Sequence, residues 1–239
     1  MPNAWRYGQP TISAITDVDD FDRGGYCPDA ALASESDPAA MFSEVADRGE
    51  WLVTRDAAPT VAIADGEPGS WLSVTTGASA DDFVSAQKNG SIWTPAAGRR
   101  IIIDARIKID DTDDTKWFIG LAVPDVTGTT LGPILDGVTD SVGFRILTGT
   151  DANIQYVTEA SSTETTGDTG YDLVDDTAIN LQAIILGTER VLFFVNGVNV
   201  FEATTNIPTA ALTKTFEVSS TTASSNLKID YLNVVGDRP

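Results

Sequence analysis

The residues best suited to chemistry in this sequence are carboxylates. Asp110, Asp111, Asp113 and Asp114 form the densest acidic cluster, directly after an alternating apolar run. Oxygen-rich clusters at the end of a strand can hold Ca²⁺, so this cluster is a candidate calcium site. A solvated connection between two strands would have the same composition. Calcium is the only cofactor that the sequence suggests, and we otherwise expect none.

A second acidic run contains Asp17, Asp19, Asp20 and Asp22. It lacks the glycine at the sixth position and the closing glutamate that define a calcium-binding EF-hand loop. The second run therefore predicts a metal site less well than the first.

Histidine and cysteine chemistry is excluded by composition. The sequence has no His and one Cys, Cys27. A Ser/His/Asp or Cys/His catalytic group cannot be assembled, and neither can a Cys/His zinc site or an intrachain disulfide. No catalytic residue is assigned.

The charge balance also narrows the set of partners. Fifteen Lys and Arg stand against 35 Asp and Glu, which gives a formal charge of -20, and each half of the chain carries -10. A surface of this sign repels phosphate, so we expect neither nucleic acid nor an anionic membrane as a partner. The longest apolar runs are a few residues, and we expect no membrane span or cleaved export signal.

The first 49 residues predict an arm followed by a short helix. Residues 1–36 show neither helical nor strand periodicity. Asp37 could cap a helix with Pro38 in its first turn and Gly49 beyond its end. Trp5, Arg6, Tyr7, Phe21 and Tyr26 are spread through the arm, and aromatic residues with arginine dominate protein interfaces. We assign these five to an interface.

Residues 50–239 predict one β-sandwich domain. Apolar residues alternate with polar ones over 101–109 and 227–235, which is typical of strands with one face on a core. Asn196-Gly197 between apolar runs predicts a tight hairpin. Residues 124–140 and 159–170 are expected to be loops. The side chains expected to point inward are Ile101, Ile103, Ile107, Leu192, Phe194, Leu227 and Ile229.

The order of these strands resembles the concanavalin A-like lectin/glucanase jelly roll. The resemblance covers about residues 50–236 and includes the strand pair joined by Asn196-Gly197 and a closing strand with Ile229, Asp230 and Tyr231. It implies an all-β, antiparallel jelly-roll sandwich. The segments 19–22, 105–108 and 118–121 further resemble tailed-phage capsid decoration, or cement, proteins that use this fold.

Glycosidases of this family carry the spacing Glu-x-Asp-x-x-Glu on one strand, where the carboxylates act as nucleophile and acid. Glu35 and Asp37 have the first spacing, but position 40 is Ala and Pro38 interrupts any strand. We therefore expect a protein that is not an enzyme.

Three functions remain, in order of preference. The first is a non-enzymatic structural protein of a virion, which decorates or cements a phage capsid through its N-terminal arm. Its partners would be the major capsid protein and neighbouring copies, with a homo-oligomer, such as a trimer, implied by the resemblance. Such a protein is made in the host cytoplasm and ends on the outer surface of the capsid. The alternatives are a lectin-like carbohydrate-binding or host-adhesion module and, least favoured, a glycan-cleaving enzyme.

Overall fold

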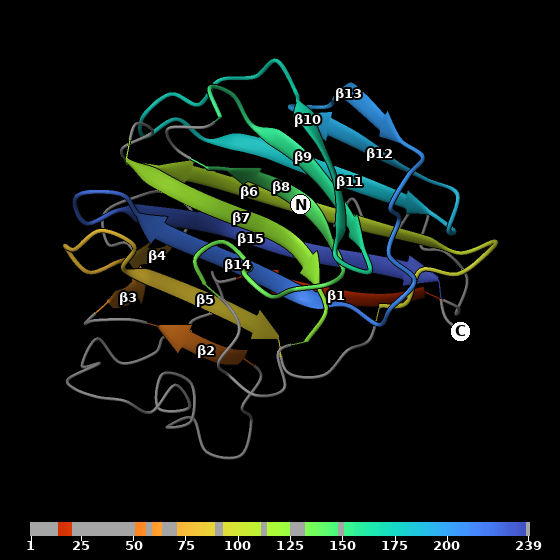
Figure 1. Ribbon diagram of the computed structural model, residues 1–239, viewed down its shortest axis with the longest axis horizontal. Coiled ribbons are helices and arrows are strands. Elements are labelled where there is room, and N and C mark those ends of the chain that lie inside the picture. Colours follow the sequence, from red (N-terminus) through yellow and green to blue (C-terminus); the bar gives the residue numbers. More distant parts are fainter. Residues whose placement is uncertain are drawn as a thin grey trace, which may run out of the picture.

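The computed structural model describes residues 14–20, 51–55, 59–63, 71–88, 93–110, 114–124, 132–147 and 151–237. The regular secondary structure of these residues is all β (Figure 1), which confirms the expected fold class. The helix expected after Asp37 lies outside the described residues. No helix within the described residues has the length and apolar character needed to cross a membrane.

Eight of the described strands form the first sheet, sheet A, in the order β13-β12-β11-β6-β15-β4-β3, with β1 also paired to β15. The bounds are β13 Val198–Ala203, β12 Arg190–Val195, β11 Ile179–Leu186, β6 Arg100–Ile109, β15 Asn226–Asp237, β4 Leu72–Thr75, β3 Thr60–Ile63 and β1 Ala14–Asp20.

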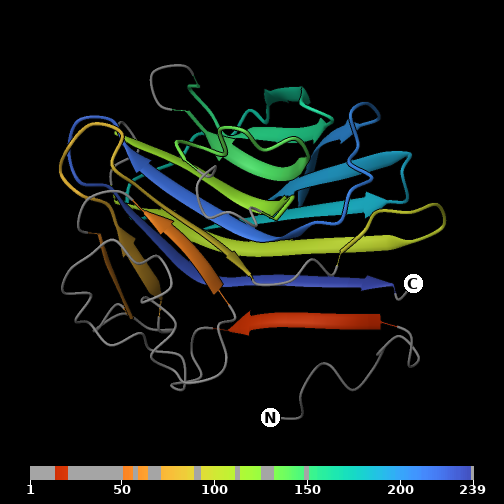
Figure 2. The same ribbon diagram turned by 60° about the horizontal axis from the view of Figure 1, so that its bottom comes forward.

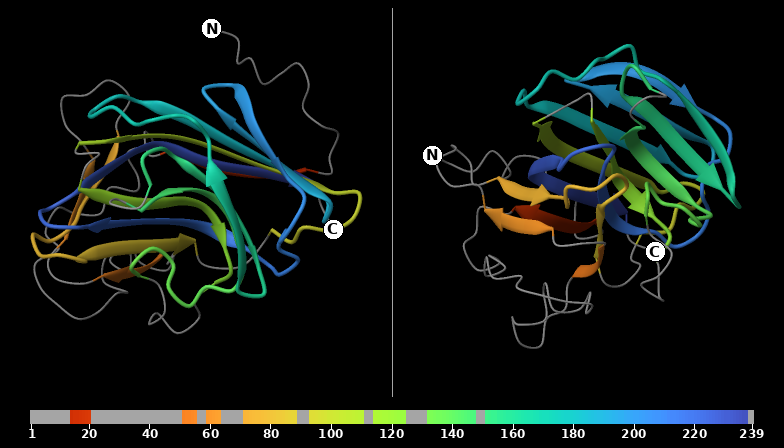
Figure 3. Two further views of the ribbon diagram at one scale, coloured as in Figure 1. Left: turned by 45° about the horizontal axis from the view of Figure 1, so that its top comes forward. Right: turned by 60° about the vertical axis from the view of Figure 1, so that its left-hand side comes forward.

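Seven described strands form the second sheet, sheet B, in the order β10-β9-β8-β7-β14-β5-β2. The bounds are β10 Thr163–Asp168, β9 Gln155–Ala160, β8 Ser141–Ile146, β7 Thr115–Ala122, β14 Thr213–Ser220, β5 Phe83–Lys88 and β2 Trp51–Arg55. The named strand pairs in both sheets are antiparallel. The left view of Figure 3 shows the sheets as two layers.

The core lies between the layers. Phe144 of β8 meets Phe193 of β12 edge to face, with ring centroids 5.3 Å apart. The inward positions expected on β6 and β15 are confirmed, because Ile101, Ile103, Ile107, Leu227 and Ile229 are all buried.

The expected inward positions on β12 are wrong by one residue. Leu192 and Phe194 are partly exposed on the outer face, whereas Val191, Phe193 and Val195 are fully buried. Both faces of this strand are apolar, so alternation alone does not tell which one meets the core. Pairing with β11 fixes the register, with Ala183 opposite Phe193.

Hairpin turns show where local sequence was and was not sufficient. Asn196 and Gly197 have φ angles of 49° and 78°, as a type I′ turn requires, so the predicted hairpin between β12 and β13 is confirmed. Residues 159–170 are not a plain loop, because β9 and β10 pair there around Ser161 and Ser162. The alternation was hidden because β10 is polar on both faces at the edge of sheet B.

The irregular arm contains one strand. Residues 14–20 pair along the second half of β15, from Ala14 opposite Asp237 to Asp20 opposite Tyr231 (Figure 2). β4 covers only the first four residues of β15, which leaves the remaining edge available to β1. Asp17, Asp19 and Asp20 therefore lie in a strand, and the expectation of an arm without regular structure is corrected for this segment.

Trp71 stabilises the outer face of sheet A. Its ring lies under the Arg106 guanidinium at 5.1 Å and the Lys108 ammonium at 4.8 Å, and Trp71 itself is 4% exposed. Trp71→Ala should therefore lower the free energy of unfolding by about 3 kcal/mol or more, through lost burial and lost cation–π contacts. Trp71→Phe should cost less, since it keeps a ring. Denaturant unfolding measures both, and equal stability of wild type and alanine variant would contradict the assignment.

Candidate functional site

The outer face of sheet B carries the most distinctive site among the described residues. Residues 132–140 cross this face, and β14 beneath them is buried along its whole length. Leu135 and Val138 of this segment form a small apolar cluster with Phe118 and Ala122 of β7. A Cβ added to Gly132 would lie 2.5 Å from the Phe83 ring, so the segment is packed closely on the sheet. We call residues 132–140 the covering loop.

Glu217 of β14 ties the covering loop to the sheet. Its carboxylate accepts a hydrogen bond from the Leu135 N–H at 2.9 Å and a second one from the Ile134 N–H. Ile134 and Leu135 have φ angles of 59° and 61°, in the left-handed region that non-glycine residues rarely occupy. The two hydrogen bonds therefore hold a strained backbone, in which successive N–H groups converge on one anion.

Burial raises the pKa of Glu217 to about 7, because the charged carboxylate has lost its contact with water. The N–H groups of Leu135 and Ile134 act in the opposite direction, and the Asp136 carboxylate adds a small further rise. Ser85, directly opposite on β5, lowers the pKa slightly, although its hydroxyl falls short of hydrogen-bond geometry. Desolvation is the dominant cause.

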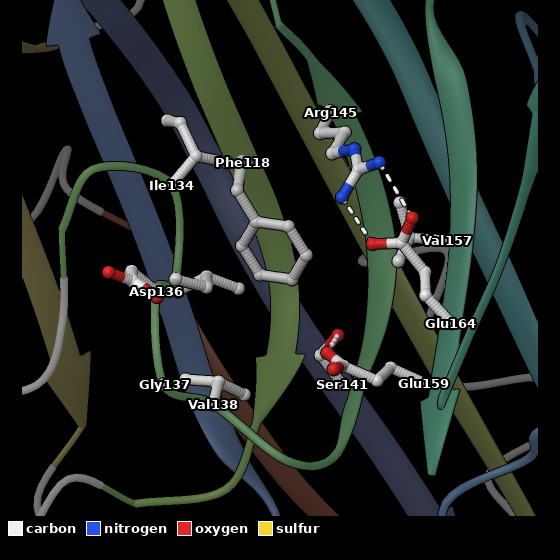
Figure 4. Close-up of a pocket in the computed structure, with 11 residues that line it drawn as sticks. Phe118, Ile134, Asp136, Gly137, Val138, Ser141, Arg145, Val157, Glu159 and Glu164 are labelled. Carbon is white, nitrogen blue, oxygen red and sulfur yellow. Dashed lines mark hydrogen bonds and ion pairs between the residues drawn. The ribbon is translucent and has the colours of Figure 1, made fainter. Parts of the chain in front are cut away.

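A pocket of about 200 Å³ lies between the covering loop and strands β8 to β10 (Figure 4). Arg145 and Glu164 form a two-pronged ion pair at its side, with the second guanidinium nitrogen 2.8 Å from a carboxylate oxygen. The Ser141 hydroxyl donates to Glu159 at 3.2 Å. The lining residues are Phe118, Ile134, Leu135, Asp136, Gly137, Val138, Ser141, Arg145, Val157, Glu159 and Glu164.

The pocket offers mainly hydrogen-bond acceptors, and the Arg145 Nε–H is a buried donor with no acceptor among the described residues. Arg145 and Glu164 neutralise each other, which leaves Glu159 and Asp136 as the lining carboxylates without an ion-pair partner among the described residues. Burial raises the pKa of Glu159 above its ordinary value, the charges of Glu164 and Asp140 raise it further, and Ser141 and the Arg145 charge lower it. The arrangement could bind hydroxyl or amine groups.

The sequence analysis did not single out Glu217. One signal was present: Glu217 stands between Phe216 and Val218, in a run with no other acid from Thr213 to Ser220. A carboxylate at such a position is either on an exposed face or buried with a partner, and only the structure supplies the loop that covers it.

The proposed calcium cluster is partly described. Asp110 accepts a hydrogen bond from the Asn226 N–H at 2.9 Å, and Asp114 accepts from the hydroxyls of Thr221 and Thr222. Those hydroxyls lower the pKa of Asp114. Asp111 and Asp113 lie outside the described residues, so calcium binding stays a prediction. Within the described residues, no three acidic side chains are grouped closely enough to hold a metal ion.

The predicted interface residues Trp5, Arg6, Tyr7, Phe21 and Tyr26 all lie outside the described residues. The structure describes only the strand between them, β1. Their contacts therefore also stay a prediction.

Comparison with solved structures identifies the architecture. An endo-1,3-β-glucanase from Streptomyces sioyaensis aligns over 97% of this chain and 99% of its own, with a TM-score of 0.62 and 12% identity. The fold is the concanavalin A-like jelly roll. The carbohydrate recognition domain of Emp46p aligns over 88% of this chain and 95% of its own, with a TM-score of 0.55 and 8% identity. A protein of unknown function from Shewanella oneidensis MR-1 has a TM-score of 0.58 and 13% identity over 95% of this chain and 87% of its own.

At such low sequence identity, the structural similarity establishes the fold of this chain alone. The sequence matches no protein-family model and no curated protein. The expected jelly-roll class is confirmed, and the narrower resemblance to phage capsid proteins passes to the proposals below.

Proposed function

We propose that this jelly roll is a non-enzymatic structural protein of a virion, which decorates or cements the outside of a phage capsid. Its arm, residues 1–49, would contact the major capsid protein and neighbouring copies, in a homo-oligomer such as a trimer. Assembly then shifts by mass action, as interface anchors become buried across a subunit boundary. No cofactor takes part.

The observation that carries the non-enzymatic part of the proposal is the closed centre of sheet B. Glu217 is fully buried under the covering loop, and both of its oxygens accept backbone hydrogen bonds. A carboxylate held in this way fixes a loop and is not presented to a substrate. The pairing of Arg145 with Glu164 likewise uses the nearest cation for structure.

Two properties favour the outside of a particle. The charge of -20 gives a surface that repels polyanions such as packaged nucleic acid. In addition, the seven residues of β1 pair with β15 in an antiparallel ladder, which fixes the arm to sheet A.

The second candidate is a lectin-like module for carbohydrate binding or host adhesion. The acceptor-lined pocket favours it, because sugar hydroxyls are donors, and one of the solved structures with this fold is a carbohydrate recognition domain. Against it, Trp51, Trp71, Trp93 and Trp117 are all at most 8% exposed, so the described part of the chain offers no indole face on which a sugar could stack.

Particle binding tests the capsid proposal. The double variant Phe21→Ala/Tyr26→Ala leaves β1 intact and should bind purified virions at least about thirtyfold more weakly, because truncating a central aromatic anchor costs roughly 2 kcal/mol. Its melting temperature should stay within about 2 °C of wild type. Phe201→Ala removes a ring that is 37% exposed on the sandwich itself and is the control that should bind normally.

Two results would count against this function. Unchanged particle binding by the folded double variant would show that the arm does not attach the protein to the particle. Inhibition of binding by free glycans, at wild-type strength, would replace the structural role by the lectin-like one.

A further inference from the structure

The middle of the covering loop is joined to the sheet by one polar anchor. Between described residues, the only hydrogen bonds from residues 133–138 to sheet B are those that the Ile134 and Leu135 N–H groups donate to Glu217. The Val138 N–H donates within the loop, to the Leu135 carbonyl at 3.1 Å. The loop otherwise rests on the sheet through the apolar cluster described above.

The end of the covering loop is fixed separately. The Thr139 carbonyl accepts a hydrogen bond from the Ser162 N–H at 2.8 Å, and the Asp140 carbonyl accepts one from the Val123 N–H at 2.9 Å. Neither bond involves Glu217. Residues 133–138 can therefore lift while residues 139 and 140 stay on the sheet.

The anchor also holds a backbone that relaxes without it. Ile134 and Leu135 are consecutive non-glycine residues in the left-handed region, with φ angles of 59° and 61°. Such a conformation persists only where its surroundings enforce it. A weaker bond to Glu217 therefore shifts the loop toward an open state.

No charge among the described residues compensates an ionised Glu217. The side chains in its row across sheet B and beside it on β14 are uncharged, namely Thr54, Ser85, Phe118, Thr215 and Ser219. The covering loop contributes one charge, that of Asp136, and it raises the pKa of Glu217. The cations that β7 and β8 carry on this face, Lys116 and Arg145, are paired with Asp81 and Glu164.

Opening of the loop is therefore linked to a proton. With the loop closed, the pKa of Glu217 is about 7, and water that reaches the carboxylate on opening returns the pKa toward the ordinary 4.5. Below pH 4.5 the group is protonated in both states, so the linkage has no effect. Above pH 7 it is ionised in both states, and the open state is favoured by the full difference in pKa.

We propose that residues 133–138 are a proton-controlled lid. While Glu217 keeps its proton, the lid lies on sheet B and forms one wall of the pocket, opposite Glu159 and Glu164 (Figure 4). When the proton is lost, the lid lifts, so that the pocket loses this wall and the side chains of Leu135 and Val138 become exposed. The inference goes beyond the proposed function and does not rest on it.

Hydrogen exchange at the Ile134 and Leu135 amides of the full-length protein tests the lid. After correction for the intrinsic pH dependence of amide exchange, the rate should rise about 80-fold between pH 5 and pH 8.5, which is the linkage expected from the two pKa values. The Val218 amide in the centre of β14 should exchange about tenfold more slowly or less at both pH values, because the lid opens without unfolding the sheet.

Two variants separate the proton from the packing of the lid. Glu217→Gln does not titrate, so its corrected loop rates should be equal at both pH values. Val138→Ala is the matched control, because it weakens the apolar contact of the lid and leaves Glu217 in place. Its rates should rise by a similar factor at pH 5 and pH 8.5, which preserves the ratio of about 80 between them.

Three results would overturn the proposal. The first is a corrected loop rate in wild type that does not change with pH, a result that decides the matter even if Glu217→Gln does not fold. The second is exchange of the loop amides at the rate of Val218, since opening would then be global unfolding. The third is an equal rise with pH in wild type and Glu217→Gln, which would assign the proton to another group.

Discussion

Glu217→Ala should lower the free energy of unfolding by about 3 kcal/mol at pH 5, because it leaves two buried N–H groups without an acceptor. Those groups belong to Ile134 and Leu135, whose left-handed backbone is held by these two hydrogen bonds to Glu217. The covering loop should open as a consequence. Hydrogen exchange at the two amides should then become roughly a hundredfold faster.

Glu164→Ala is the matched control, since it removes a carboxylate from the same face of sheet B. Glu164 is paired with Arg145 near the surface, with about a third of its side chain exposed. Because the Arg145 side chain is only 15% exposed, the loss of its partner should cost about 1 to 2 kcal/mol, and it should leave the loop amides protected. If the two alanine variants lose equal stability, or if the amides of Ile134 and Leu135 stay protected without Glu217, the covering loop is held by its apolar contacts alone.

The second large effect is a pH dependence carried by the same group. The pKa of Glu217 is about 7 in the folded protein against an ordinary 4.5, so the folded state binds the proton more tightly than the unfolded state does. The stabilisation from this group is complete below pH 4.5 and is lost as the pH rises to about 7. We expect the loss to be about 3 kcal/mol between pH 4 and pH 8.

Glu217→Gln isolates this contribution, because glutamine does not titrate. The difference in the free energy of unfolding between wild type and Glu217→Gln should fall by that amount as the pH rises. Asp104 and Glu159, whose pKa values burial also raises, are present in both proteins and cancel. Urea unfolding at several pH values measures the difference. Parallel stability curves for the two proteins would show that Glu217 is not desolvated in solution.

These two predictions concern a residue that the sequence marks only by its place between Phe216 and Val218. Residues 213–220 contain six polar side chains and two apolar ones, so their pattern does not tell whether Glu217 is exposed or buried. Its partners lie 82 and 83 residues earlier in the chain. Long-range pairing of this kind leaves no local periodicity.

What the sequence by itself determined is the class of structure and the limits on chemistry. Two-residue alternation over 101–109 and 227–235 indicates strands with one buried face, and Asn196-Gly197 indicates a tight hairpin, because each depends only on neighbouring residues. The absence of His and the single Cys27 remove whole groups of catalytic and metal sites by composition alone.

Only the tertiary structure decided register, added strands and buried polar pairs. Leu192 and Val191 are both apolar, so the register of β12 against β11 determines which of them faces the core. β1 formed because β4 leaves half of β15 unpaired, a vacancy more than 200 residues away in the chain. Asp104 and Asn233 meet because β6 pairs with the other edge of β15. The local sequence determines the chemical groups that a residue carries. The packing of strands that are distant in the chain determines which groups it contacts and how far it is buried from water.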